Sequence, residues 1–189
     1  MNTDISIRMA TENDTEEILR IYALYVKNTA ITFEYTIPSV EEFSQRIRDT
    51  LKMYPYIVAL EDNHIAGYAY ASPFKQRAAY NWAVETTIYL RENCRGNGLG
   101  KKLYLALEDI LKRQNIINLN ACIAYTPCED IYLHNSSTAF HEHLGYTRVA
   151  HFKKCGYKFS TWYDMIWMEK ILGEHPHTPD AVIPITEFH

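Results

Sequence analysis

The sequence lacks the features that mark disulfide-rich, metal-binding, membrane-spanning and nucleic-acid-binding proteins. Its four cysteines are scattered, without a C-x-x-C pair or a metal-ligand spacing, so we expect reduced thiols and no metal site. No apolar run reaches membrane-spanning length, and residues 1–30 lack the apolar core of a signal peptide. The net charge of −4 argues against nucleic acid as a partner. We therefore expect a cytoplasmic protein with no membrane or nucleic-acid partner.

Length and composition indicate a single domain. The 189 residues are 47% hydrophobic and 22% charged, which is ordinary for a globular protein with a substantial core. From about residue 173 the composition shifts toward proline and histidine. We predict one domain over residues 1–172 and a C-terminal tail over residues 173–189, which wraps the surface or is disordered.

Glycine is scarce too, but three of the seven glycines stand at alternate positions in one segment. This segment, Arg95–Gly100, follows an apolar, β-branched run at residues 84–90 and leads into apolar residues at helical spacing from residue 103. A strand, a glycine-rich turn and a helix start place free backbone N–H groups at the positive end of a helix. The arrangement predicts an anion site, most naturally for a pyrophosphate.

Two common phosphate-binding loops do not match this segment. A P-loop ends in Gly-Lys-Ser/Thr, whereas Lys102 follows Gly100-Lys101 here, so the hydroxyl that would hold magnesium is missing. A dinucleotide fingerprint needs Gly-x-Gly-x-x-Gly and an acidic residue about 20 positions later. Residues 115–120 offer no acid at that distance.

The order of predicted elements indicates an α/β fold with a mixed sheet and helices on its faces. Helices are expected after Asp14, after the capping box of Ser39 and Glu42, over residues 98–114, and from Asn135 to His143. The hairpin at residues 56–71 makes the sheet partly antiparallel, so a doubly wound nucleotide-binding fold is not expected. Strands are expected at residues 5–9, 56–60, 65–71, 84–90, 119–125, 146–155 and 162–170.

The glycine segment resembles motif A of the GNAT superfamily of N-acetyltransferases, Gln/Arg-x-x-Gly-x-Gly/Ala, at Arg95, Gly98 and Gly100. The predicted element order is also that of the GNAT acyl-CoA N-acyltransferase fold. The resemblance implies acetyl-CoA as co-substrate, with its pyrophosphate in the loop. It also implies that backbone amides of the preceding strand hold the pantetheine arm and the oxyanion. By resemblance, the cofactor-binding residues are Ile88, Tyr89, Leu90, Arg95, Gly96, Asn97, Gly98, Leu99, Gly100, Lys101 and Asn135.

Longer segments resemble the phosphinothricin acetyltransferase branch, with similarity from about residue 5 to residue 172. That branch acetylates the amino group of small amino-acid analogues such as phosphinothricin, methionine sulfoximine and methionine sulfone. One region departs from it: Asn135-Ser136-Ser137 is one position out of phase with the branch's Asn-x-x-Ser, and His134 is the in-phase alternative as the CoA contact. The matching segments are Gly67–Phe74, Arg77–Tyr80, Trp82–Glu85, Gly156–Phe159 and Trp162–Asp164.

Acetyl transfer requires a base, because aliphatic amines are mostly protonated near neutral pH. Glu85 is the candidate, since a carboxylate within an apolar strand has a raised pKa. By resemblance, His141 is linked to catalysis and could relay a proton or donate one to the departing thiolate. Tyr132 or Tyr146 could equally serve as the acid, and the sequence does not choose among the three.

The loop before the catalytic strand is basic and is expected to border the acceptor. Lys75 and Arg77 could grip an anionic group, the guanidinium in bidentate fashion. Phe33 and Phe74 are plausible apolar walls. By resemblance, the acceptor is surrounded by Lys75, Gln76, Arg77, Glu85, Thr86 and Thr87.

Several alternatives remain open at this point. The acceptor could be a polyamine, an aminoglycoside or a protein N-terminus. A polyamine site should be lined with acids, and the acidic loop at Cys128-Glu129-Asp130 is consistent with one. The chain could also be a CoA-binding regulatory module without turnover. By resemblance to the branch, we expect a homodimer.

Overall fold

The computed structural model describes residues 5–188, which fold around one seven-stranded mixed sheet. The strand order is β1-β2-β3-β4-β5-β7-β6. The strands are β1 (Ile5–Met9), β2 (Tyr56–Glu61), β3 (His64–Pro73), β4 (Ala83–Leu90), β5 (Asn118–Tyr125), β6 (Thr147–Lys158) and β7 (Thr161–Ile171). The helices are α1 (Thr15–Asn28), α2 (Val40–Leu51), α3 (Leu99–Arg113) and α4 (Ser136–His143). The predicted element order and mixed sheet are confirmed.

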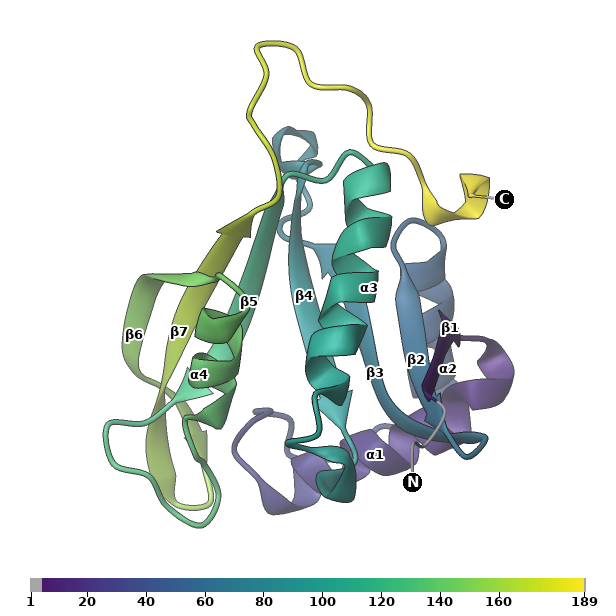
Figure 1. Cartoon of the computed structure of the whole chain (residues 1–189). Coiled ribbons are helices and arrows are strands. Elements are labelled where there is room, and N and C mark those ends of the chain that lie inside the picture. The colour runs from purple at the N-terminus through teal and green to yellow at the C-terminus, as the bar shows by residue number, and fades with distance from the viewer. Residues whose placement is uncertain (1–4, 189) are drawn as a thin grey trace.

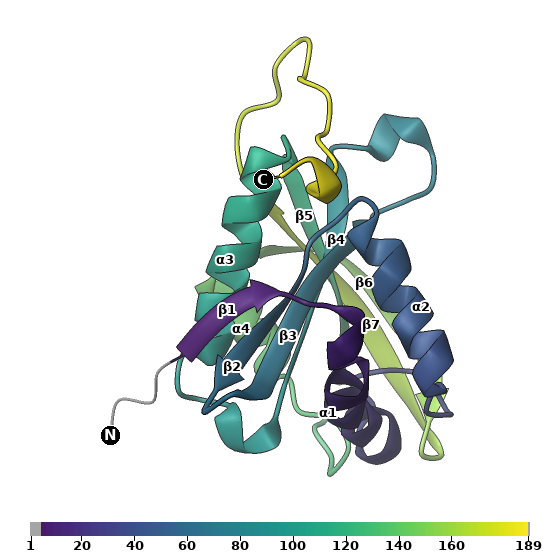
Figure 2. The ribbon, with the colours of Figure 1, turned by 90° about the vertical axis from the view of Figure 1, so that its right-hand side faces the viewer.

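The helices cover the two faces of the sheet, as Figure 1 and the turned view of Figure 2 show together. The helices α3 and α4 lie on one face, and α1 and α2 lie on the other. The apolar side of α3, including Leu103, Leu107 and Leu111, packs mainly on β3, β2 and β4. The opposite core is rich in tyrosine, with Tyr22 and Tyr68 buried between α1, α2 and the sheet. No helix within residues 5–188 is long and apolar enough to cross a membrane.

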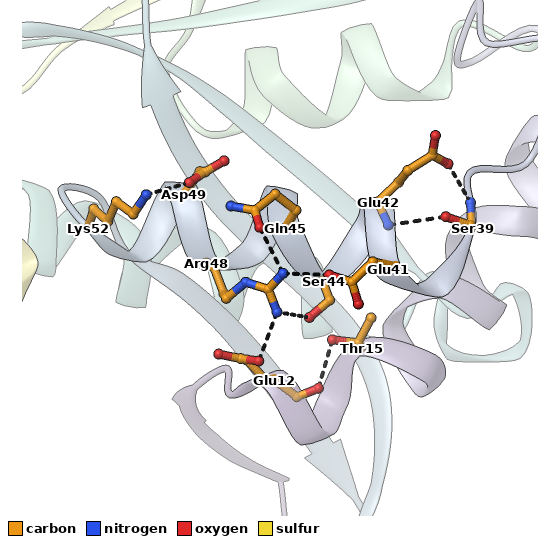
Figure 3. Close-up of polar contacts among 10 residues, drawn as sticks. All are labelled: Glu12, Thr15, Ser39, Glu41, Glu42, Ser44, Gln45, Arg48, Asp49 and Lys52. Carbon is orange, nitrogen blue, oxygen red and sulfur yellow. Dashed lines mark hydrogen bonds and ion pairs between the residues drawn. The ribbon is translucent and has the colours of Figure 1, made fainter.

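The helix α2 shows how local signals in the sequence set an element. Its capping box is confirmed: the Glu42 amide donates to Ser39 Oγ at 3.1 Å, and the Ser39 amide donates to Glu42 Oε2 at 2.7 Å. Arg48 then ties α2 to the turn that precedes α1 through its ion pair with Glu12 at 3.0 Å (Figure 3). These contacts hold α2 on the face that also carries α1.

The strands β4 and β5 are paired over a short stretch only. They run parallel and are in register from Ala83 with Asn118 to Glu85 with Asn120. Beyond Glu85 the ladder between them ends, although β4 continues to Leu90 and β5 to Tyr125. The two strands therefore separate beyond Glu85, and we call the opening between them the splay. Figure 1 shows β4 and β5 diverging.

The C-terminal segment returns to the domain. After β7 it crosses the end of the sheet and reaches the region of β2 and the end of α3 (Figure 1). The indole of Trp82 donates to the carbonyl of Asp180 at 2.7 Å, and the Ile183 amide donates to the Gln114 carbonyl at 3.1 Å. Of the two states expected for this tail, the described residues adopt the surface-wrapping one.

Candidate active site

The glycine loop has a conformation that glycine favours and lies open to its surroundings. Gly96 has φ +77° and Gly98 has φ +84°, both in the left-handed region. A Cβ built on either residue would meet no atom within 4 Å. The backbone of this loop is therefore accessible to a bound group, which is the geometry that a phosphate-wrapping loop needs.

The loop leads into α3 with several backbone N–H groups outside the helical ladder. The bond that opens the ladder runs from the Lys102 amide to the Gly98 carbonyl at 3.1 Å. Asn97 Oδ1 accepts from the Leu99 amide at 3.1 Å, and the Leu99 side chain is buried in the core. Gly100 lies against Phe140, so close that a Cβ would come within 3.1 Å of the ring. The amides of Gly100 and Lys101 are the helix-terminal donors that could face an anion.

A cleft of about 940 Å³ lies beside this loop. Its walls are α1, the end of β4 with the loop up to Arg95, and the segment before α4. A smaller cavity of about 60 Å³ lies deeper, between the diverging parts of β4 and β5. The two spaces share Ile31 and His134 as lining residues. Together they form a path from the glycine loop into the splay.

Glu85 lies where the splay begins. Side chains alternate along β4, so Glu85 shares a face with Thr87 and Tyr89. Burial raises the pKa of the Glu85 carboxyl, and the charge of Lys75 partly opposes that rise. A half-buried carboxylate with a raised pKa suits proton abstraction near neutral pH.

Of the basic loop, Lys75 is the residue that the structure brings close to Glu85. Its Nζ lies 4.7 Å from the centroid of the Phe74 ring and 5.4 Å from that of Trp167, and these two rings pack edge to face. Gln76 and Arg77 are exposed on the same loop. The Phe74 and Trp167 rings, which we call the Phe74–Trp167 corner, therefore hold the Lys75 ammonium near the Glu85 carboxylate. Trp167 was not predicted as a site residue. It lies opposite Cys122 in the register of β5 and β7.

The two threonines predicted beside the acceptor lie on opposite faces of β4. The Thr87 side chain shares the face of Glu85, whereas Thr86 is buried on the α3 side. Thr86 Oγ1 lies 3.2 Å from the Tyr146 hydroxyl and 3.3 Å from the Asn120 carbonyl oxygen. The structure therefore brings Thr87, but not the side chain of Thr86, to the side of Glu85.

His141 lines the inner cavity from a buried position on α4. Its Nδ1 lies 2.7 Å from the Ser137 carbonyl oxygen, which only accepts, so Nδ1 carries the proton. Its Nε2 then accepts from the Tyr104 hydroxyl at 2.9 Å. Burial lowers the pKa of His141 to about 4, against the opposing effect of the Ser137 carbonyl. At neutral pH the ring is therefore an uncharged acceptor at Nε2, without a proton there to donate to a thiolate.

The tyrosines considered as alternative acids differ in access. Tyr146 is buried, with its hydroxyl on Thr86, and burial raises its pKa far above the ordinary value. Tyr132 lines the large cleft, and its ring is stacked on Phe159 with centroids 4.0 Å apart. Tyr104 was not predicted at all. Its spacing on α3 predicts a core residue. Its hydrogen bond to His141 joins residues of different helices, so the sequence pattern does not reveal it.

Asn135 and His134 are placed differently at the start of α4. The side-chain amide of Asn135 binds the backbone of Thr126, directly after β5. Its Oδ1 accepts from the Thr126 backbone amide at 3.2 Å, and its Nδ2 donates to the Thr126 carbonyl at 2.8 Å. His134 lines both the cleft and the inner cavity, and its Nδ1 lies 3.2 Å from Glu129 Oε2. Of the two residues, His134 is the one that faces the path into the splay.

Phe33 lies on the loop between α1 and α2 and packs on β6. A Cβ at Gly156 would come within 2.2 Å of the Phe33 ring, so the ring lies against the glycine backbone. The buried ammonium of Lys158 holds the same loop by donating to three carbonyls at 2.8 Å each, those of Val26, Thr29 and Thr32. This role of Lys158 was not predicted, since one lysine in a strand pattern does not reveal its acceptors.

Comparisons with known proteins agree with this geometry. Residues 7–167 match the family model described as acetyltransferase (GNAT) domain. The chain is 30% identical to the phosphinothricin N-acetyltransferase of Streptomyces viridochromogenes, over 97% of this chain and 96% of that protein. It is also 30% identical to the L-methionine sulfoximine/L-methionine sulfone acetyltransferase of Salmonella typhimurium, over 94% and 99%. The structure of a phosphinothricin acetyltransferase from Sinorhizobium meliloti in complex with AcCoA superposes with a TM-score of 0.86, at 35% identity over 96% and 97%.

Proposed function

The chain belongs to the GNAT acetyltransferase family, and we propose that it transfers the acetyl group of acetyl-CoA to the amino group of a small amino acid or a close analogue. Relatives named for phosphinothricin and for methionine sulfoximine or sulfone match nearly the whole chain. The observation that carries the proposal is the arrangement along β4. Glu85 stands at the start of the splay, the glycine loop follows the far end of β4, and the cleft and the inner cavity lie along the strand between them.

The residues of the cleft fit acetyl-CoA. The open backbone at Gly96 and Gly98 and the first amides of α3 suit its pyrophosphate. From Glu85 to Leu90 the strand spans roughly 17 Å at about 3.3 Å per residue, so the loop and the carboxylate are separated by the length of an extended arm. When bound, acetyl-CoA supplies a thioester whose carbonyl carbon an amine can attack.

Glu85 is the proposed general base. Its carboxylate accepts a proton from the ammonium of the acceptor, which leaves a free amine lone pair beside the splay. Lys75, on the Phe74–Trp167 corner, and Arg77 supply positive charge on the same side, which suits an acceptor that carries a carboxylate or phosphinate. Phe33, Gln76 and Thr87 complete the proposed acceptor site. The residue proposed to bind through its backbone is Thr86, whose side chain is turned away.

His141 acts in this proposal as an uncharged positioning group. Because Nε2 accepts from Tyr104, the ring fixes that hydroxyl at the wall of the inner cavity. Tyr132, which borders the cleft, is the proposed proton donor to the departing thiolate. The cofactor contact proposed at the start of α4 is His134, because the side chain of Asn135 is occupied by Thr126.

The polyamine alternative loses its main support in the structure. Asp130 accepts from the amides of Tyr132 and Leu133 at 2.8 Å each and from the Tyr163 hydroxyl at 2.7 Å. Glu129 accepts from the Asn135 amide at 2.7 Å. Both carboxylates of the acidic loop therefore hold the loop itself, so an amino-acid acceptor is preferred to a polyamine.

Release of CoA thiol from acetyl-CoA tests the proposal, with phosphinothricin, methionine sulfoximine, methionine sulfone, spermidine and an aminoglycoside as acceptors. We expect saturable release with the first three. Release only with spermidine or the aminoglycoside would overturn the acceptor class while leaving the reaction intact. Binding of acetyl-CoA without release for any amine would indicate a CoA-binding module instead.

We further propose that the protein works in the cytoplasm as a homodimer. The hairpin of β6 and β7 forms the edge of the sheet and exposes several large apolar side chains, namely Val149, Phe152, Tyr157 and Trp162. An exposed apolar group at a sheet edge is a common site of self-association. Light scattering after size exclusion gives the mass directly, and a monomer at high concentration would overturn this part of the proposal.

A further inference from the structure

The two edges of β4 differ beyond Glu85. The Arg91 amide donates to the Ala66 carbonyl of β3 at 2.8 Å, so the backbone groups of Arg91 face β3. Backbone groups of successive residues in a strand point to alternate edges. Those of Leu90 and Ile88 therefore face the other edge, which β5 has left at Glu85. This open edge is the wall of the splay along which the acetyl-CoA arm is proposed to lie.

Tyr25 of α1 closes the open edge at Leu90. Its hydroxyl donates to the Leu90 carbonyl at 2.6 Å and accepts from the Leu90 amide at 3.1 Å. A single side chain thus replaces the missing strand partner for both backbone groups. The Leu90 amide, expected from the sequence to bind the cofactor, is already engaged. On the same edge, the amide of Ile88 is the next donor toward Glu85.

The ring of Tyr25 also contacts the glycine loop. The guanidinium carbon of Arg95 lies 5.1 Å from the ring centroid, in cation–π geometry. The ring itself is buried and packs edge to face on Tyr89, with centroids 4.8 Å apart. The residue lines the large cleft together with Leu90 and Arg95. One side chain therefore touches both the β4 edge and the motif that is expected to hold the pyrophosphate.

We propose that Tyr25 is a positioning residue for acetyl-CoA, an inference that rests on the proposed function. Its hydroxyl fixes the end of the open β4 edge, so that the Ile88 amide is left as the donor to the acetyl carbonyl. Its ring fixes Arg95 beside the glycine loop. A residue of α1 thereby fixes the β4 edge and the glycine loop, the two parts of the proposed cofactor site, relative to each other.

Calorimetric binding of CoA and of ADP to three variants tests this role. Tyr25→Phe keeps the ring and removes the hydroxyl, so we expect the Kd of CoA to rise about three- to tenfold while that of ADP, which lacks the pantetheine arm, is unchanged. Tyr25→Leu removes the ring as well and should weaken both ligands. Tyr22→Phe is the matched control, because Tyr22 is a buried tyrosine of the same helix whose hydroxyl contacts Thr32 at 2.9 Å.

Steady-state kinetics and a second background complete the test. In Tyr25→Phe we expect a raised KM for acetyl-CoA with an unchanged KM for the acceptor, a split that general loss of stability would not produce. In an Arg95→Ala background, Tyr25→Leu should no longer weaken ADP binding more than Tyr25→Phe does, since the stacking partner is gone. CoA binding by Tyr25→Phe equal to wild type would overturn the inference. Absence of CoA binding in the wild-type protein would instead overturn the proposed function.

Discussion

At the scale of single residues, Glu85 is the group on which turnover is expected to depend most. It begins the splay on the side of Lys75, and burial raises its pKa. We expect Glu85→Gln to bind acetyl-CoA normally and to lose about 10²–10⁴-fold in kcat, because the amide cannot accept a proton. Glu16→Gln, an exposed carboxylate on α1, serves as the control. Near-normal kcat in Glu85→Gln would show that another group removes the proton.

The pH profile follows from the charge beside this carboxylate. Lys75 lowers the pKa of Glu85 against the larger effect of burial. Lys75→Met removes that charge, so the pKa of Glu85 rises further and the base is protonated up to a higher pH. The acid limb of kcat/KM should therefore move to higher pH in Lys75→Met. It should stay in place in Lys52→Met, the control, because Lys52 is exposed at the C-terminal end of α2. A shift to lower pH in Lys75→Met would contradict the assignment.

His141 offers a second check at the residue scale. Burial lowers its pKa to about 4, so the ring binds no proton in the folded state over the range where a free imidazole, with a pKa near 6.5, becomes charged. The unfolded state takes up that proton first as the pH falls, and folding stability contributed by His141 is lost between about pH 6.5 and 4. Imidazole resonances followed by NMR should show no titration of His141 above pH 5. A midpoint above pH 6 would instead restore the charged acid expected from the sequence.

At the scale of elements, Lys158 of β6 holds the end of α1. Its ammonium donates to the carbonyls of Val26, Thr29 and Thr32, which lie at and beyond the C-terminus of that helix. Lys158→Met leaves these carbonyls without their donor, and we expect the free energy of unfolding to fall by about 2–4 kcal/mol. Urea denaturation measures this change. Lys153→Met, at an exposed position of the same strand, should change it by less than about 0.5 kcal/mol.

The same contact links stability to acceptor binding. The loop held by Lys158 carries Phe33, whose ring lies on Gly156. In Lys158→Met we therefore expect a raised KM for the acceptor and little change in the KM for acetyl-CoA. Equal changes in both would show that the loop does not belong to the acceptor side.

Most elements could be predicted because their signals are local. The capping box of Ser39 and Glu42, the alternation in β4 and the spacing in α3 all depend on residues within one or two turns. The family motif likewise lies in one short segment. The fold and the cofactor loop were accordingly accessible from the sequence.

Contacts between distant segments could not be predicted in the same way. The bonds of Asn135 to Thr126, of Tyr104 to His141 and of Tyr25 to Leu90 join residues far apart in the chain or on different elements. Each changes the role that a residue type suggests on its own. The separation of Thr86 from Glu85 is different, because strand alternation alone implies it.

At the scale of the whole molecule, the C-terminal segment ties together parts that the sheet does not connect. The Gln114 side chain, fully buried at the end of α3, donates to the carbonyls of Met53 and Ile183 at 2.8 and 2.7 Å. The Ile185 amide donates to the Met53 carbonyl at 3.0 Å. The segment therefore joins the C-terminus of α3 to the connection between α2 and β2. We therefore propose that this surface-wrapping segment contributes to the stability of the domain, with Val182 packed against the main core.

A chain ending at Leu172 tests this conclusion. Truncation removes the bonds made by Ile183 and Ile185 and the packing of Val182 on the main core, so we expect the free energy of unfolding to fall by about 2–5 kcal/mol. The glycine loop lies at the opposite end of α3, roughly 22 Å away along its 15 residues. Acetyl-CoA should therefore bind with an unchanged Kd at temperatures where the truncated protein stays folded. Denaturation curves that coincide for the two chains would show that the domain ends at residue 172, whereas lost binding in a folded truncated protein would mean that the segment acts on the cofactor site through α3.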